Sequence, residues 1–201
     1  MGKKIEGIDV SHWNAIDTIP KYAPQFVMMK ITEGCGFIDP DYLAHRQQCK
    51  NLGIPYGYYH YARAERNGAI DEARFFVTKI PHEDLPNAIL ALDYEGKALS
   101  IKNVDAWAYD FCSEVLRLTG KKPLLYCSQS TVKRFPRTCA AGFGLWVARY
   151  RNKLLGAGDI TPWKFAAMWQ YTSKGVDKNI FYGTVNQFRK YGEVAVLQLK
   201  N

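Results

Sequence analysis

The sequence of 201 residues lacks the short motifs by which several enzyme classes are identified. It contains no HExxH zinc motif, no Walker phosphate loop and no GxSxG nucleophile elbow. These absences argue against a zinc peptidase, a P-loop nucleotidase and an α/β-hydrolase. We therefore expect the chain to use neither a metal ion nor a cofactor.

The sequence also lacks membrane and export signals. No apolar run approaches the length of about 20 residues that a membrane helix needs. The basic residues near the N-terminus are not followed by the apolar stretch of a secretory signal peptide. We expect a protein that is made in the cytoplasm, does not insert into membranes, and reaches its place of action after release or assisted export.

The cysteines do not show the pattern of a disulfide framework or a zinc site. The five cysteines are an odd number, and no CxxC pair occurs. This favours free thiols in a reducing compartment over a disulfide framework or a zinc site. A Cys–His nucleophile remains an alternative, although Cys127 is expected to be a buried thiol within a strand.

Positive charge is present in excess, with a formal net charge of +8 and a pI of about 9.2. Such a surface attracts polyanions, namely nucleic acid, an anionic membrane or an acidic cell wall. The basic residues are scattered, and no basic helix of the kind found in nucleic-acid readers occurs. We expect no nucleic-acid partner, and we expect a monomer.

Seven short apolar or aromatic runs recur, each about as long as a strand buried on both faces. They occupy 5–11, 26–31, 54–61, 88–95, 123–128, 144–149 and 165–171. Helical patterns lie between several of them at 39–53, 68–80 and 103–120, the first with Asp39 as its predicted N-cap and Gly53 as its end. The alternation predicts an α/β fold, specifically one single-domain, irregular, TIM-barrel-like (β/α) barrel over 1–201. The helical signal weakens after about residue 140, so the last strands are expected to lack regular helices.

The run NAILALDYEG at 87–96 ends in two carboxylates, Asp93 and Glu95. Alternate side chains of a strand point to one face, so the two acids would project together. Like charges at that spacing repel, and one carboxyl group then retains its proton more strongly. The pair is either two solvated acids at a strand end or a catalytic acid beside a carboxylate partner.

The chemistry of such barrels lies at the C-terminal ends of the strands. The predicted strand ends gather acids and aromatic residues at one rim: Asp9, Ser11, His12, Trp13, Lys30, Thr32, Glu33, Tyr58, His60, Tyr61, Asp93, Glu95, Tyr126, Ser128, Arg149, Tyr150, Trp169, Gln170 and Tyr171, with Asp177 and Asn179 just beyond. Carboxylates for proton transfer and rings for stacking suit the cleavage of a neutral, polyhydroxylated substrate.

Seven motifs follow one another over nearly the whole chain: GIDVSHW, FVMMKITEG, GIPYGYYHY, DEARFF, LALDYEG, LWVARY and MWQYTSKGVDKNIF. In this order they resemble the glycoside hydrolase family 25 lysozymes, which are N-acetylmuramidases of phages and bacteria. Residues after about 185 match poorly. The resemblance implies an irregular β/α barrel that acts on the glycan strands of peptidoglycan, at the β-1,4 bond between N-acetylmuramic acid and N-acetylglucosamine.

The resemblance also implies roles for individual residues. Glu95 would be the general acid that protonates the leaving oxygen, Asp93 its partner at the sugar, and Asp9 and Asp177 would line the same pocket. Five further residues either contact the substrate or only pack and neutralise charge: Lys30, Tyr58, Tyr126, Trp169 and Gln170. His12 and His60 are expected to be structural histidines held by hydrogen bonds.

Two other functions compete with the lysozyme hypothesis. A chitinase-like glycosidase also carries a strand-borne DxE, but its longer acid run would need Asp where this chain has Ala91. An inactive glycan-binding module on the same scaffold is disfavoured because all four expected acids are present.

The spacing of Asp93 and Glu95 also predicts the stereochemistry. Neighbours on one strand are poorly placed for inversion, which needs carboxylates about 6.5–9.5 Å apart, so retention of configuration is predicted. Asp93 would either attack the sugar or, as we prefer, stabilise the substrate's own attacking acetamido group.

Overall fold

The computed structural model describes residues 2–151 and 156–194. Residues 1, 152–155 and 195–201, which the predicted domain includes, lie outside the described residues. Within the described ranges the strands run, in chain order, β1 (Ile5–Val10), β2 (Val27–Glu33), β3 (Phe37–Ile38), β4 (Tyr56–Tyr61), β5 (Ile89–Asp93), β6 (Leu124–Ser128), β7 (Gly144–Ala148), β8 (Met168–Thr172) and β9 (Asp177–Phe181).

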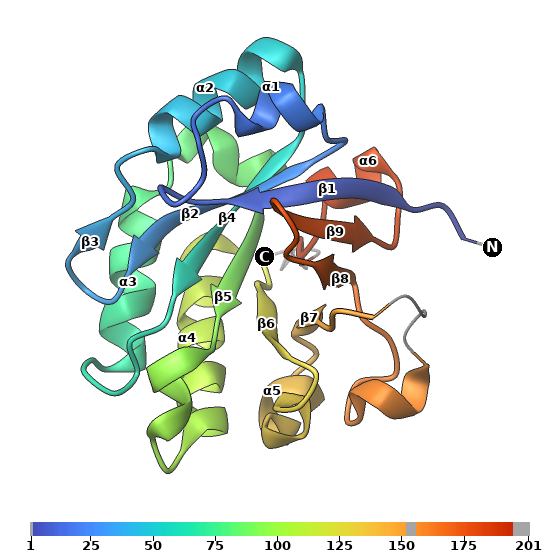
Figure 1. Cartoon of the computed structure of the whole chain (residues 1–201). Coiled ribbons are helices and arrows are strands. Elements are labelled where there is room, and N and C mark those ends of the chain that lie inside the picture. Colours follow the sequence, from blue (N-terminus) through green and yellow to red (C-terminus); the bar gives the residue numbers. More distant parts are fainter. Residues whose placement is uncertain (1, 152–155, 195–201) are drawn as a thin grey trace, which may run out of the picture.

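The strands close into a barrel, because β1 pairs with β2 on one side and with β9 on the other. The order around the barrel is β1, β2, β4, β5, β6, β7, β8, β9, and the short β3 pairs only with β2 (Figure 1). Around the barrel, all pairings from β1 to β8 are parallel, whereas β9 is antiparallel to both of its neighbours. The short β3 outside the barrel is antiparallel to β2. The predicted barrel is confirmed, with an added last strand that the apolar runs do not contain.

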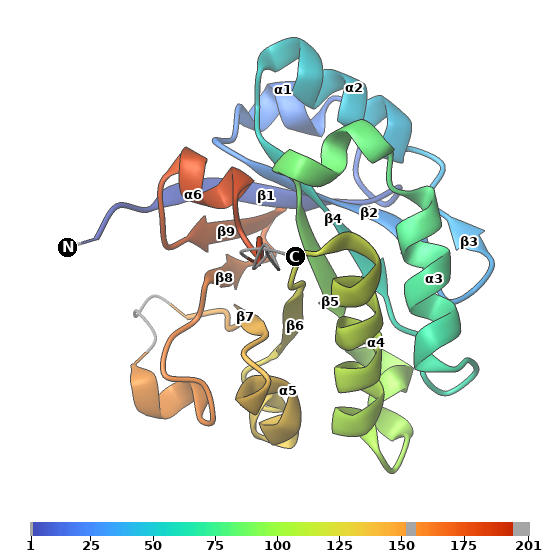
Figure 2. The ribbon, with the colours of Figure 1, turned by 180° about the vertical axis from the view of Figure 1, so that it is seen from behind.

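Helices cover one side of the barrel more completely than the other. The α-helices are α1 (Thr18–Tyr22), α2 (Tyr42–Leu52), α3 (Ala69–Lys79), α4 (Val104–Thr119), α5 (Pro136–Ala140) and α6 (Val185–Arg189). The 3-10 helices are η1 (His82–Asn87), η2 (Gly96–Ser100), η3 (Val132–Arg134) and η4 (Ala157–Ile160). Figures 1 and 2 show the long helices α2, α3 and α4 beside β2, β4 and β5, while β8 passes to β9 with no helix. The predicted lack of regular helices around the last strands is therefore confirmed. None of the described helices is long and apolar enough to cross a membrane.

The predicted start of the helix at 39–53 was wrong. Helix α2 begins at Tyr42, and Asp41 occupies the N-cap position. Asp39 is instead fully buried, and its Oδ2 accepts hydrogen bonds from the backbone N–H and the ring of His12, at 3.0 and 2.8 Å. Its other oxygen accepts from the backbone of Asp41, at 3.1 Å. Asp39 thus ties the loop after β1 to the start of α2, and the predicted structural role of His12 is confirmed.

Alternate residues of each strand face two separate apolar cores. The inner core fills the barrel with Ile5, Phe26, Met28, Tyr59, Ile89, Ala91, Leu124, Tyr126, Trp146, Ala167, Met168, Phe181 and Phe188. The outer core packs the intervening strand residues, such as Leu90 and Val147, against the helices. The strand parity therefore decides whether a side chain belongs to the barrel interior or to the helix layer.

Helix α6 closes one end of the barrel. Phe188 is fully buried, and its ring centroid lies 4.8 Å from that of Phe26 and 5.3 Å from that of Phe181. Phe26 precedes β2 and Phe181 ends the antiparallel β9, so the closed end holds the N-terminal ends of the parallel strands. Among the described residues, the opposite end, where the parallel strands terminate, is the end left for a site.

Candidate active site

The end of β5 brings Asp93 and Glu95 to the open end of the barrel. All five residues of β5 are buried, with Ala91 in the inner core, so the alternation directs Asp93 inward. Tyr94 points to the helix layer and is fully buried there. Glu95 keeps an extended backbone (φ −146°, ψ −170°), so its side chain returns to the side of Asp93. Asp93 and Glu95 therefore share one face, as predicted.

The other two acids come from opposite ends of the sequence. Asp9 lies in β1 and Asp177 in β9, and the antiparallel ladder sets these two residues directly opposite each other. Residues facing each other in this way project to the same side of a sheet. Asp9 is buried, and Asp177 is partly exposed.

One cavity of about 280 Å³ contains all four carboxylates. Its lining consists of Asp9, Ser11, Trp13, Asn14, Lys30, Tyr59, Tyr61, Asp93, Glu95, Tyr126, Trp146, Gln170 and Asp177. The interpretation of Asp93 and Glu95 as two solvated acids fails, because Asp93 is buried and both face this cavity.

Burial and mutual repulsion raise the proton affinity of the whole group. Burial first, and then the charge of Asp177, raises the pKa of Asp9 to about 7. Burial followed by the charges of Glu95 and Asp9 raises the pKa of Asp93 well above its usual range. The pKa of Glu95 is raised by burial and by Asp177, and opposed by the cation of Lys30. At neutral pH such a cluster can hold at least one transferable proton.

Two amides hold Asp9 in place from below the cavity. Asp9 Oδ2 accepts hydrogen bonds from Gln170 Nε2 at 2.9 Å and from Asn179 Nδ2 at 2.7 Å. Asn179 Oδ1 accepts in turn from Trp146 Nε1 at 2.8 Å, and Gln170 Oε1 accepts from the hydroxyl of Tyr126 at 2.9 Å. These bonds stabilise the ionised form of Asp9 and oppose the upward shift of its pKa.

Seven of the nine predicted site residues line the cavity, but Tyr58 and Trp169 do not. Tyr58 is fully buried in the outer core, and its hydroxyl donates to Asp84 Oδ2 at 2.6 Å. Trp169 also lies in the outer core, and its Nε1 donates to the backbone oxygen of Arg149 at 2.8 Å. Of the two alternatives predicted for Tyr58 and Trp169, the structure supports packing over substrate contact, because both lie on the helix-facing side of their strands.

Four aromatic rings of the cavity were absent from the nine predicted site residues, although Trp13 and Tyr61 were expected at the rim: Trp13, Tyr59, Tyr61 and Trp146. The register could have identified three of them. Tyr61 pairs with Asp93, Asp93 pairs with Tyr126, and Tyr126 pairs with Trp146, so these residues share one face. Counting in steps of two from Asp93 and its partners would have selected Tyr59 and Tyr61 over Tyr58.

A closed β/α barrel with clustered, proton-holding carboxylates at the C-terminal ends of its strands, bordered by aromatic rings, defines a glycoside hydrolase site. The model of glycosyl hydrolases family 25 matches residues 8–180. The chain therefore belongs to glycosyl hydrolases family 25, and the resemblance in its motifs is confirmed.

Similar proteins come from bacteria, phages and fungi. Lysozyme M1 of Streptomyces globisporus is 27% identical over 208 residues, covering 90% of this chain and 68% of that protein. The lysozyme of Streptococcus phage Cp-1 is 26% identical, and the match covers 86% of this chain but only 52% of the phage protein. The solved structure of a family GH25 lysozyme from Aspergillus fumigatus superimposes with a TM-score of 0.78 at 25% identity, covering 96% of this chain and all of the fungal chain.

Proposed function

We propose that this chain is a lysozyme that hydrolyses the β-1,4 bond between N-acetylmuramic acid and N-acetylglucosamine in peptidoglycan. The observation that carries the proposal is the single cavity that holds Asp9, Asp93, Glu95 and Asp177 in a member of this family. We further propose that the protein acts as a monomer on glycan strands, without nucleic acid or membrane insertion. It would reach the wall after release or assisted export.

Glu95 is the proposed general acid. It lies at the rim of the cavity and is partly exposed, so it can reach the glycosidic oxygen of a polymer bound across the opening. Its raised pKa keeps the carboxyl group protonated to a higher pH than an ordinary Glu. Asp93 lies deeper and is buried, where a carboxylate can stabilise positive charge that develops on the sugar.

The function is tested by identifying the new ends in digested cell walls. Purified peptidoglycan is incubated with the protein, its reducing ends are reduced, and the fragments are analysed by mass spectrometry. A muramidase leaves reduced N-acetylmuramic acid at the new ends. Reduced N-acetylglucosamine ends, or release of product from chitin at a comparable rate, would contradict the proposed bond.

We predict that Glu95→Gln preserves the fold and removes most of this activity. The substitution keeps the shape of the side chain but removes the transferable proton, and general acid catalysis contributes about 10²–10⁴ in rate. Initial rates of wall clearing for the wild type and the variant measure the loss, with thermal unfolding as the check on folding. A variant that retained more than roughly a tenth of the rate would exclude Glu95 as the acid.

We also predict that the anomeric configuration is retained. Asp93 and Glu95 face one cavity from neighbouring positions of a single strand end, which suits retention better than a base on the opposite face of the sugar. Proton NMR of the first product, recorded before mutarotation, should show the β anomer, and an initial α anomer would refute retention. Capture of a sugar ester on Asp93 by a fluorosugar would leave retention intact but replace the preferred acetamido-assisted route.

A further inference from the structure

The ammonium group of Lys30 is held at the cavity wall by a partner outside the four acids. Lys30 Nζ lies 2.6 Å from Glu33 Oε2, and both side chains are largely covered, with exposed fractions of 7% and 23%. The same nitrogen lies 4.8 Å from the ring centroid of Tyr61 and 5.4 Å from that of Phe37. The cation therefore lies between aromatic rings and one carboxylate, beside the cavity that it helps to line.

Glu33 is itself fixed from behind. Its Oε1 accepts from Arg63 Nη1 at 2.7 Å, and Arg63 Nε donates to Glu65 at 2.8 Å. The backbone N–H of Arg63 donates to the buried carboxylate of Glu72, at 3.1 and 3.2 Å to its two oxygens. The far end of this chain of contacts is therefore anchored in the buried outer layer.

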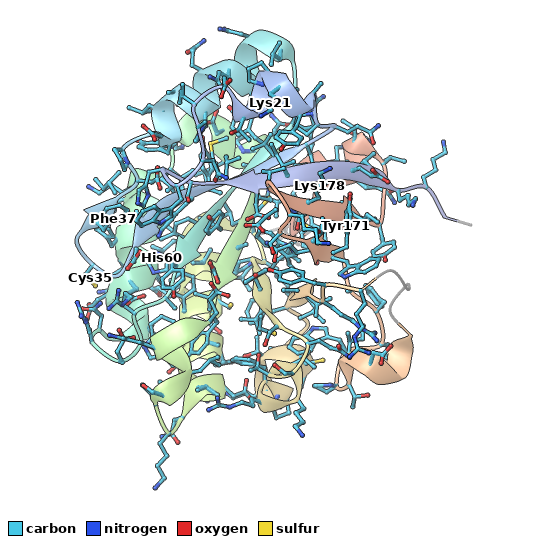
Figure 3. All side chains as sticks on the ribbon, in the orientation of Figure 1. Lys21, Cys35, Phe37, His60, Tyr171 and Lys178 are labelled. Atoms are coloured by element: carbon cyan, nitrogen blue, oxygen red, sulfur yellow. The ribbon has the colours of Figure 1, made fainter. Side chains whose placement is uncertain are left out.

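The anchor in the outer layer is a fully buried pair. Glu72 Oε2 lies 2.8 Å from His60 Nε2, and the other ring nitrogen of His60 lies 2.8 Å from the hydroxyl of Thr32. The predicted structural role of His60 is confirmed. Figure 3 shows His60 on the same side of the barrel as Phe37, near β2 and β4.

Asp93 offers the cation an alternative partner. Asp93 Oδ1 is buried, and none of the described residues donates a hydrogen bond to it. Buried carboxylate oxygens without donors are costly, and an ammonium group within reach would satisfy this one. Lys30 lines the same cavity, yet it is paired with Glu33 instead.

From these contacts we propose that Glu33 is a positioning residue, which holds the Lys30 ammonium at the cavity wall and prevents it from forming an ion pair with Asp93. The proposal deepens the proposed function, because an Asp93 neutralised by Lys30 could not stabilise charge on the sugar. Lys30 then acts on Asp93 and Glu95 only at a distance, as a cation that tempers the mutual repulsion of the acids.

The charged and titratable groups around the Lys30–Glu33 contact determine the direction in which each substitution should shift the pKa of Asp93 and Glu95. Lys30 faces Glu33 on β2, Tyr61 on β4, Asp93 at the end of β5 and Glu95 just after it. Glu33 faces Lys30 and Arg63. Lys30 lowers the pKa of both Asp93 and Glu95. Glu33 raises the pKa of Asp93, but less than Glu95 and Asp9 do. Releasing Lys30 toward Asp93 should therefore lower the pKa of both acids, whereas removing the cation should raise them.

The test is a carboxyl ¹³C NMR titration of the free protein, which needs no substrate. In Glu33→Gln we expect the midpoints of Asp93 and Glu95 to fall by roughly 1 pH unit, the lower end of the effect of a close opposite charge. In Lys30→Met they should rise. The double variant should titrate like Lys30→Met, since Glu33 acts through Lys30. Glu65→Gln, which also contacts Arg63 but not Lys30, should leave both midpoints unchanged.

Activity measurements separate this inference from the proposed function. The pH profile of wall clearing by Glu33→Gln should shift to lower pH in step with the NMR midpoints. Two outcomes would refute the positioning role. The first is a folded Glu33→Gln variant whose Asp93 and Glu95 midpoints equal those of the wild type. The second is a Glu33→Gln substitution that shifts these midpoints as far in the Lys30→Met background as it does in the wild type. A wild type that releases no muramic acid ends would refute the proposed function, while the NMR titration would still decide the role of Glu33.

Discussion

Trp13 is an exposed aromatic residue at the edge of the cavity. Its side chain is 83% exposed, yet it lines the cavity and lies 4.6 Å, between ring centroids, from His12. The buried carboxylate of Asp39 fixes His12, so the ring of Trp13 rests on an ordered support. An exposed aromatic ring held at the edge of a polar cavity offers an apolar face with a polar tip, which suits contact with a bound ligand.

We predict that Trp13→Ala weakens wall binding without destabilising the fold. The exposed ring contributes little to the core, whereas the loss of about 1.4 kcal/mol of contact with a sugar corresponds to a tenfold loss of affinity. The apparent KM for soluble glycan strands should rise several-fold with little change in kcat. Phe165→Ala is the matched control, since Phe165 is 75% exposed but does not line the cavity. Equal effects of the two substitutions would contradict a specific role for Trp13.

Side-chain direction is the residue property that the sequence predicted least well. Strand ends converge at one rim whatever the exact register, so Asp9, Asp93 and Glu95 were expected there with Asp177 just beyond. The resemblance to family 25 then selected these four acids as a group. The prediction named Tyr58 where the structure places Tyr59 in the cavity. Both residues belong to one aromatic run, in which neither hydropathy nor residue type distinguishes inward from outward positions. In a barrel with apolar cores on both faces, the usual apolar-polar alternation is absent, so a one-residue error is easily made.

At the scale of elements, the junction between β5 and η2 depends on Gly96. Its φ of +56° lies in the left-handed region, and an added Cβ would lie 2.6 Å from the hydroxyl of Tyr61. That hydroxyl belongs to a ring of the cavity, and Gly96 directly follows Glu95. A side chain at residue 96 is thus strained by the backbone and would displace the hydroxyl of Tyr61 from its present position in the cavity.

We predict that Gly96→Ala lowers both stability and activity. The left-handed backbone alone costs about 1–2 kcal/mol for a residue with a Cβ, and the clash would also displace Tyr61 or Glu95. Gly53→Ala is the matched control, because Gly53 has a φ of +66° but nothing within 4 Å of an added Cβ. Both variants should lose thermal stability, and only Gly96→Ala should lose most of its wall-clearing activity. If the Gly53→Ala variant lost as much activity, the loss would reflect stability alone.

The elements themselves were predictable where the sequence pattern is local. Gly53 and Gly120 end α2 and α4 in left-handed conformations, as helix-terminal glycines commonly do. β9 could not be read in this way. β9 begins with Asp177, Lys178 and Asn179, a polar sequence whose strand conformation comes from pairing with β1 and β8. Helix α6 is only five residues long and was not predicted, although the sequence carries one local signal for it, the capping box of Thr184 and Gln187. Its position at the end of the barrel comes from the packing of Phe188 inside the barrel.

For the whole molecule, the clustered acids link stability to pH. The folded protein raises the pKa of Asp9 from its ordinary value of 3.8 to about 7. Between these values the folded state holds a proton that the unfolded chain releases, so the associated stability is present at low pH and is lost as the pH rises toward about 7. Above that pH the folded protein must accommodate another buried negative charge beside Asp177 and Glu95.

We therefore predict that Asp9→Asn is more stable than the wild type at pH 8 and loses activity. Asn cannot ionise, and its side-chain oxygen can still accept from Gln170 and Asn179. Each 1 kcal/mol gained corresponds to roughly 2–4 °C in Tm for a chain of this size. Thermal unfolding from pH 4 to pH 8 should show the Tm difference growing with pH. If the Tm curves of the wild type and Asp9→Asn ran parallel over this pH range, the ionisation of Asp9 would not be the cause of the pH-dependent loss of stability.

The pairing of β1 with β9 makes the active site a property of the completed chain. Asp9 and Asp177 face each other only after the two ends of the barrel sequence have met, which is the contact with one of the largest loop-closure costs in the molecule. A growing chain that has not yet delivered β9 lacks Asp177, one of the four acids, and also Asn179, whose amide donates to Asp9. The four-acid cluster is therefore assembled only after the last strand of the barrel has been synthesised.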